Sequence, residues 1–239
     1  MRVVVSLGGS VLAPDLDEES IRANAEAIEQ LEAAGVELGI VVGGGSIARD
    51  YIEAARELGE NEIALDDIGI SVTRLNARLL IAALDGLAAP TPVESYEAGL
   101  KAMRRGDIPV LGGVTPGQTT DAVSAALAEY VEADLLVYAT SVPGVFTADP
   151  DQDDQAEHIS SMTPADLVDV IVDTELIAGS SAPVDLLAAK LIERSGMRTI
   201  VLDGTEPKRV VDAVLRGAHD GTDITPDGNR TSLPAWERE

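Results

Sequence analysis

The sequence feature that most constrains the fold is a short apolar run that ends in a glycine-rich loop. The first example is residues 3–7, which are followed by Gly8, Gly9 and Ser10. A β-branched run of this kind is typical of a strand buried on both faces, and the glycines after it allow the backbone to approach a ligand closely. The loop fits either a phosphate cradle or a plain turn between strand and helix, so the rest of the chain must decide.

The same pattern returns along the chain. Residues 36–42 lead into three glycines at 43–45, residues 108–111 lead into a Gly-Gly-Val-Thr-Pro-Gly loop, and residues 135–140 lead into a Ser-Val-Pro-Gly-Val-Phe loop. Apolar strands that alternate with helices favour a parallel sheet, and ligands of such sheets bind beyond the carboxyl ends of the strands. We therefore expect an α/β fold in which these loops converge on one crevice.

Between the apolar runs, hydrophobic residues recur every three to four positions, which predicts helices. No break in composition forces a division of the chain, so we expect one domain over 1–224 and a loosely held tail over 225–239, where periodicity is lost. The expected helices lie near residues 21–31, 50–58, 67–84, 122–130, 184–195 and 207–216, another helix begins at 163–166, and a late strand covers 199–202.

The composition excludes several kinds of chemistry. The 239-residue chain has no cysteine, which removes disulfides, thiolate metal sites and cysteine nucleophiles. His158 and His219 stand outside any catalytic-looking context, and we expect both at the surface. We find neither a signal peptide nor an apolar run of the roughly 20 residues that span a bilayer, so we expect a cytoplasmic protein.

The charge balance is strongly acidic. Against 42 Asp and Glu the chain has 17 Lys and Arg, a net charge of −25. Nucleic acids and anionic membranes need clustered cations, so neither is an expected partner. Excess acid with few aromatic residues suggests adaptation to high salt, where counterions screen the repulsion between carboxylates.

Three positions suggest phosphate or sugar recognition. Arg49 lies about one helical turn beyond the glycines at 43–45, where a guanidinium can stabilise phosphoryl oxygens; a tight turn with an exposed arginine is the alternative. Asp66 stands near the expected start of the helix at 67–84, where a carboxylate caps the helix or binds ribose hydroxyls, and position alone favours the cap. Phe146 can stack on a base or cover an edge.

No loop has the Gly-x-x-x-x-Gly-Lys-Ser/Thr pattern of a P-loop or the Gly-x-Gly-x-x-Gly signature of dinucleotide folds. Taken in order, the loops instead resemble those of the amino acid kinase family, and within it the archaeal uridylate (UMP) kinases. The resemblance runs over residues 1 to about 224. It rests on Leu7-Gly8-Gly9-Ser10, Val42-Gly43-Gly44-Gly45 with Arg49, Asp66-Asp67-Ile68-Gly69, Gly112-Gly113 through Thr119-Thr120-Asp121-Ala122, and Thr140 to Asp149-Pro150.

This resemblance implies a three-layer αβα sandwich around a mainly parallel central sheet, and phosphoryl transfer from MgATP to UMP. It also implies a homo-hexamer built as a trimer of dimers. The half up to about residue 122 would bind UMP and form the oligomer, and residues 123–224 would bind ATP. No protein ligand for a metal is implied, because Mg²⁺ would be carried by ATP.

The resemblance also implies a role for individual residues. Arg49 and Asp121 are the expected catalytic residues, although capping its own helix is the favoured alternative for Asp121. The implied ATP-binding residues are Gly9, Ser10, Gly45, Arg49, Thr140, Phe146 and Asp149, and the implied UMP-binding residues are Gly44, Asp66, Val114, Thr115, Pro116, Gly117, Gln118, Thr119 and Thr120.

Two departures from the family pattern stand out. Many relatives carry a lysine where this chain has Ser6 and another where it has Pro183, so transition-state charge would fall on Arg49, Mg²⁺ and helix ends. Lys190 is expected at the surface rather than as a substitute. Two alternatives stay open: a kinase of the same fold that acts on isopentenyl phosphate, carbamate or an amino-acid carboxylate, and a non-catalytic nucleotide-binding protein.

Overall fold

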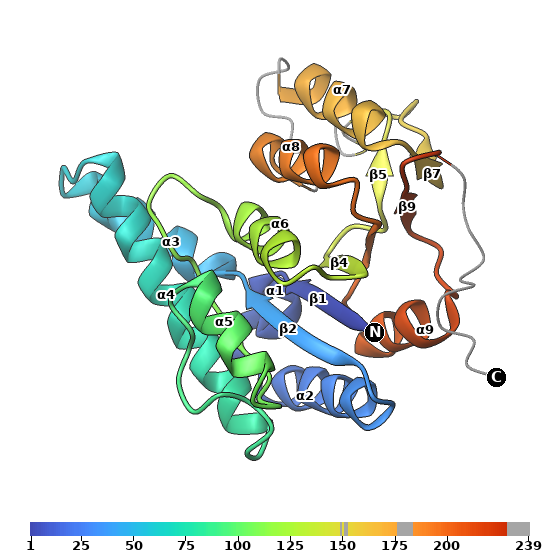
Figure 1. Ribbon diagram of the computed structural model, residues 1–239. Coiled ribbons are helices and arrows are strands. Elements are labelled where there is room, and N and C mark those ends of the chain that lie inside the picture. Colours follow the sequence, from blue (N-terminus) through green and yellow to red (C-terminus); the bar gives the residue numbers. More distant parts are fainter. Residues whose placement is uncertain (149, 151–152, 176–183, 229–239) are drawn as a thin grey trace.

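The computed structural model describes residues 1–148, 150, 153–175 and 184–228 (Figure 1). In this part of the chain one sheet has seven strands, in the order β3-β2-β1-β4-β8-β9-β7. The first five are mutually parallel, whereas β9 runs antiparallel to β8 and pairs in parallel with β7. The strands are β1 (Arg2–Leu7), β2 (Glu37–Val42), β3 (Val110–Leu111), β4 (Leu135–Thr140), β7 (Ser161–Met162), β8 (Thr199–Asp203) and β9 (Thr222–Ile224).

Helices cover both faces of the sheet, and a separate antiparallel pair, β5 (Val145–Phe146) with β6 (His158–Ile159), lies outside it. The helices are α1 (Gly9–Leu12), α2 (Glu18–Ala33), α3 (Gly45–Glu57), α4 (Glu62–Ala83), α5 (Tyr96–Met103), α6 (Thr120–Tyr130), α7 (Pro164–Glu175), α8 (Leu186–Ser195) and α9 (Pro207–Arg216), with a 3₁₀ turn at Pro14–Leu16.

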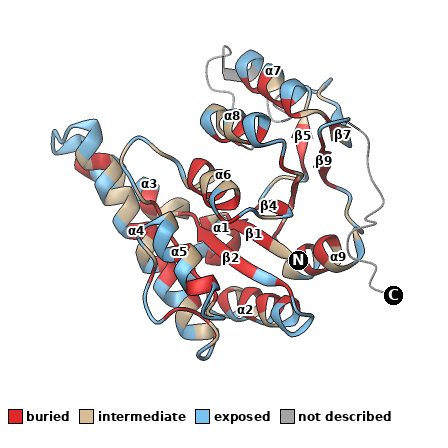
Figure 2. Cartoon of the chain, viewed as in Figure 1, coloured by how far each residue is buried: buried red, intermediate tan, exposed pale blue. Residues whose placement is uncertain are grey.

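The hydrophobic core forms two clusters, one on each face of the sheet. Val3 and Val5 of β1 point into a cluster with side chains of α2, α4 and α9. Val4, between them in sequence, points into a second cluster with side chains of α6, α7 and α8, because successive strand residues face opposite sides. Figure 2 shows the buried strands between these helix layers. The three-layer αβα sandwich predicted from the sequence is confirmed.

Both clusters draw residues from before and after position 122. The single domain over 1–224 and its division into two halves stay predictions. The packed chain also continues beyond that limit. Thr225 is buried, and its N–H donates to the carbonyl of Met162 at 3.1 Å. Of the predicted tail, residues 229–239 lie outside the described residues.

One helix begins earlier than its periodicity predicts. Helix α4 begins at Glu62 rather than near residue 67, because the side chain of Asn61 accepts a hydrogen bond from the N–H of Ala64 and caps the helix there. Asp66 therefore lies inside α4, and its predicted capping role is wrong. A comparable correction applies to Asp121, since the cap of α6 is the hydroxyl of Thr119, which accepts from the N–H of Ala122.

Candidate active site

The strand register brings the glycine loops to one edge of the sheet. Leu7, the last residue of β1, pairs with Val42 at the end of β2 and with Ala139 near the end of β4. Val41 of β2 pairs with Leu111 at the end of β3. The carboxyl ends of these four parallel strands are therefore level, and the loops that follow them begin at the same edge of the sheet, as the sequence predicts.

The first two glycine loops contact each other through their backbones. A Cβ atom on Gly9 would lie 2.1 Å from the backbone nitrogen of Gly45 and 2.7 Å from the carbonyl oxygen of Gly43, so no side chain fits. Gly45 also has φ +68°, a left-handed conformation that favours glycine. Gly43 and Gly45 therefore permit the close approach between the two loops, whereas a Cβ atom on Gly44 would lie 2.4 Å from the Cβ of Ala48 in the first turn of α3.

Helix α4 supports these loops from one side. The buried side chain of Asn76 donates hydrogen bonds to the carbonyls of Gly43 at 2.9 Å and Gly44 at 3.3 Å. The hydroxyl of Thr73 accepts a hydrogen bond from the N–H of Gly113 at 2.7 Å. Neither residue could be identified from the sequence, because polar residues inside a helix carry no signal until the loops they contact are known.

The cationic groups near this edge are arginines. Arg49 lies on the exposed surface of α3 and forms no ion pair with any described residue, so its guanidinium can approach an anionic ligand. Arg74 of α4 is already engaged: it donates to the carbonyl of Gly113 at 3.3 Å and pairs with Glu94 at 3.2 Å. Lys190 is exposed and pairs with Glu193, which fits the expected surface position.

The loop at 114–120 is held by residues from three other elements. The carboxylate of Asp66 on α4 accepts a hydrogen bond from the N–H of Gly117 at 2.8 Å. Gln118 accepts one from the hydroxyl of Tyr96 at 3.2 Å. The hydroxyl of Thr119 donates to the carboxylate of Asp185, which caps α8. Asp66 and this loop, predicted to share the UMP subsite, are thus brought together.

Two carboxylates lie close to each other at the starts of α6 and α8. Burial, together with the nearby charge of Asp185, raises the pKa of Asp121 to about 7. Beneath them, the buried hydroxyl of Tyr138 donates to the backbone carbonyl of Asp121 at 2.8 Å. Asp121 is therefore close to half-protonated at neutral pH, which lowers the negative charge at the starts of α6 and α8.

The residues expected to hold the ATP nucleoside follow β4. Thr140 ends that strand, and its hydroxyl bonds both the N–H and the carbonyl of Val142 at 3.1 and 3.0 Å. Phe146 is partly exposed on β5. Asp149 lies outside the described residues, as does Pro183. Ser6, where many relatives carry a lysine, is buried in β1, and its side chain brings no charge to the loops.

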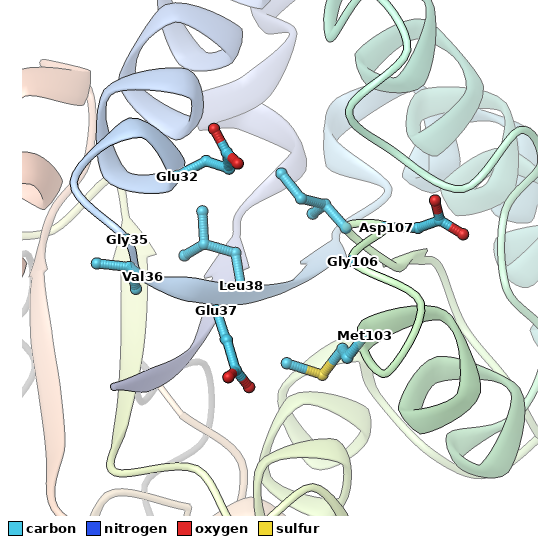
Figure 3. Close-up of a pocket in the computed structure, with 9 residues that line it drawn as sticks. Glu32, Gly35, Val36, Glu37, Leu38, Met103, Gly106 and Asp107 are labelled. Carbon is cyan, nitrogen blue, oxygen red and sulfur yellow. The ribbon is translucent and has the colours of Figure 1, made fainter.

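The described residues contain no group of three or more His, Asp or Glu side chains that could by itself hold a metal ion. An acidic pocket of about 210 Å³ does lie between α2, β2 and the end of α5, and Figure 3 shows the carboxylates of Glu32, Glu37 and Asp107 there. This pocket lies at the amino end of β2, opposite the glycine loops, and its negative charge does not suit a phosphate.

In the described chain no helix is both long and apolar enough to cross a membrane.

Facing glycine loops at the carboxyl edge of a mainly parallel sheet define a protein that binds phosphorylated small molecules. The model of the amino acid kinase family matches residues 1–203, and the chain belongs to that family. A protein from Halobacterium salinarum named uridylate kinase is 70% identical over 236 residues, which cover 99% of this chain and 98% of that protein. A uridylate kinase from Haloarcula marismortui is 66% identical over 227 residues, covering 95% of this chain and 100% of that protein.

Solved structures agree with the sequence relatives. The crystal structure of uridylate kinase from Archaeoglobus fulgidus matches with a TM-score of 0.83 and 43% identity, covering 94% of this chain and 100% of that one. The crystal structure of UMP kinase from Bacillus anthracis matches with a TM-score of 0.78 and 26% identity, covering 95% of this chain and 96% of that one. The family and the fold expected from the sequence are both confirmed.

Proposed function

We propose that this chain transfers a phosphoryl group from MgATP to UMP and yields ADP and UDP. The observation that carries the proposal is the backbone contact between the loops at Gly9 and Gly43–Gly45, beside the loop at 114–120. Phosphoryl transfer requires two phosphates held in line with their charge neutralised, and it needs no covalent nucleophile. Two glycine-rich loops in backbone contact at the starts of α1 and α3 suit that requirement, because loops of this kind can bind phosphates through their backbones.

The assignment of the two substrates follows the resemblance to the uridylate kinases. Gly9, Ser10 and Gly45 would contact the ATP phosphates, and Gly44 the UMP phosphate, with the transferred group between them. Asp66 and the loop at 114–120 would bind the UMP nucleoside, and Thr140 and Phe146 that of ATP. Asp149, outside the described residues, is expected on the ATP side as well.

Charge neutralisation would come from Arg49, from helix N-termini and from Mg²⁺. Arg49 is exposed and unpaired among the described residues, so its guanidinium can bind phosphoryl oxygens without breaking an existing ion pair. Mg²⁺ typically binds phosphate oxygens, waters and one or two carboxylates rather than a dedicated protein cage. An ion that arrives with ATP would supply charge stabilisation of the phosphates.

Other acceptors of this fold are the alternatives, and the curated relatives favour UMP over them. An assay that couples ADP release to NADH oxidation, run with UMP, CMP, dUMP and isopentenyl phosphate, ranks them by kcat/KM. We expect UMP to exceed isopentenyl phosphate by more than about 100-fold, because a site built around a nucleoside leaves polar groups unpaired without it. A preference for isopentenyl phosphate would reject the proposal.

The assembly would be a homo-hexamer, a trimer of dimers, in the cytoplasm, where ATP and UMP are available. The antiparallel helices α3 and α4 leave large apolar side chains exposed, and a second copy of the chain would bury them. Light scattering would measure a mass of six chains if this is correct. These side chains are Tyr51, Leu58, Ile63, Leu75 and Leu79.

A further inference from the structure

Phe146 lies outside the main sheet, so contacts other than the sheet's own strand pairing must fix the position of its side chain. It belongs to β5, which pairs with β6 at two register positions, Val145 with Ile159 and Phe146 with His158. A two-stranded pair of this size has little stability of its own in water. The location of the Phe146 ring relative to the glycine loops therefore depends on contacts between the β5–β6 pair and the sheet.

Thr222 of β9 supplies that contact. Its side chain is fully buried, and its hydroxyl accepts a hydrogen bond from the N–H of Val145 at 2.8 Å and donates one to the carbonyl of Ile159 at 2.5 Å. One hydroxyl thus joins both strands of the pair to the main sheet, since it uses its donor and an acceptor at the same time. Removing it would leave two buried backbone groups without this partner.

Gly144 permits this close approach. A Cβ atom at Gly144 would lie 2.7 Å from the hydroxyl oxygen of Thr222 and 2.5 Å from Nε2 of His158. The histidine ring therefore lies against the same point of the chain as the threonine. The imidazole and the Phe146 ring are also in an edge-to-face contact, with centroids 5.3 Å apart and an interplanar angle of 69°.

We infer that Thr222 and His158 are positioning residues for the nucleoside of the phosphoryl donor. Thr222 acts through the backbone of β5 and β6, and His158 acts through the ring of Phe146, which stays partly exposed and able to stack on a base. This inference rests on the proposed function, because it takes Phe146 as the residue that contacts ATP. The expected surface position of His158 is confirmed, because the residue is exposed. Its ring also contacts the ring of Phe146.

The test compares Thr222→Val with a matched control. Valine keeps the shape of threonine and removes the hydroxyl, so we expect KM for ATP to rise about five- to tenfold, the effect of a lost buried hydrogen bond. KM for UMP and kcat should change less than about twofold. Thr199→Val is the control, since Thr199 is equally buried on the adjacent β8 but its hydroxyl donates to the local carbonyl of Met197, two residues away, at 3.3 Å.

Two further variants separate positioning from general stability. Thr222→Ser retains the hydroxyl and should restore the KM for ATP to within about twofold of the wild-type value. His158→Leu removes the ring edge at an exposed position, where folding is not at risk, and should raise KM for ATP about threefold with KM for UMP unchanged. If Thr222→Val does not fold, the effect of His158→Leu on KM for ATP tests the inference.

Calorimetric binding of a non-hydrolysable ATP analogue provides a readout that does not need UMP turnover. The Kd of the analogue should rise in Thr222→Val and His158→Leu by the same factors as KM for ATP. If the wild-type chain binds the analogue but never phosphorylates UMP, the proposed function fails while this binding comparison still tests the inference. Unchanged ATP affinity in both variants, or an equal loss of UMP affinity, would overturn the inference.

Discussion

The carboxylate of Asp66 and the backbone N–H of Gly117 form a 2.8 Å hydrogen bond across 51 residues of sequence. This bond joins the N-terminal part of α4 to the loop at 114–120. A carboxylate that only capped a helix would accept from N–H groups of its own first turn. Asp66 instead holds the loop at 114–120. The bond therefore links the two segments, α4 and this loop, that are expected to enclose UMP.

Replacing Asp66 with asparagine should weaken UMP binding. The amide is neutral and a weaker acceptor than the carboxylate, so the loop loses a charge-assisted hydrogen bond. We expect KM for UMP to rise about tenfold, with KM for ATP within twofold, in steady-state assays. Asp67→Asn is the matched control, because Asp67 is the exposed neighbour on the same helix. Equal effects of the two substitutions would contradict a specific role of Asp66.

Arg49→Ala should lower kcat by more than tenfold, because the guanidinium would stabilise charge that develops on the transferred phosphoryl group. Arg56→Ala is the control on the same helix, since the guanidinium of Arg56 is already paired with Glu53 and Glu62. Steady-state kcat values of the two variants, measured at saturating substrates, make the comparison. A turnover number unchanged by Arg49→Ala would return this residue to the role of an exposed surface arginine.

Gly9→Ala should disrupt the contact between the two glycine loops. Its Cβ atom would lie 2.1 Å from the nitrogen of Gly45, so one of the loops must move. We expect the free energy of unfolding to fall by about 1–3 kcal/mol, as in other overpacked sites, and phosphoryl transfer to be lost. Gly8→Ala is the control, because a Cβ there would meet its nearest atom at 3.4 Å. Denaturant unfolding of both variants would show whether only Gly9 is sensitive.

The raised pKa of Asp121 predicts a pH-dependent cost to stability. Because its pKa is about 7 when folded and near 3.8 when unfolded, the folded chain holds the extra proton between these values, and stability from this group falls as pH rises through that range. Asp121→Asn removes this contribution. The free energy of unfolding of the variant minus that of the wild type should therefore increase from pH 4 to pH 8, and a difference independent of pH would show that the pKa is not raised.

The parallel part of the fold was predictable because its strands are apolar runs that end at glycine-rich or hydroxyl-rich loops. Residues 3–7 and 135–140 are apolar without interruption, and the glycines after 42 leave no doubt about where that strand ends. The strands β7 and β9 were missed because they have two and three residues, too few for a periodic pattern. Pairing with β8 and with each other, rather than local propensity, makes them strands.

The candidate site was predictable at the level of its loops and not of their supports. Gly9, Gly45 and the loop at 114–120 were found because glycines and hydroxyls cluster where strands end. Asn76 and Thr222 were missed, since a single buried polar residue gains meaning only from partners 33 and 77 positions away. The capping role of Asp66 was wrong because Asn61, a better-placed cap, begins the helix earlier.

The most direct test of the proposed activity observes the product itself. Phosphorus NMR of the chain with MgATP and UMP in multimolar KCl, where its acidic surface is screened, should show UDP and ADP appearing together in equal amounts. The same mixture without UMP should leave ATP unchanged. Absence of UDP at every salt concentration, with a folded chain that still binds ATP, would contradict the account.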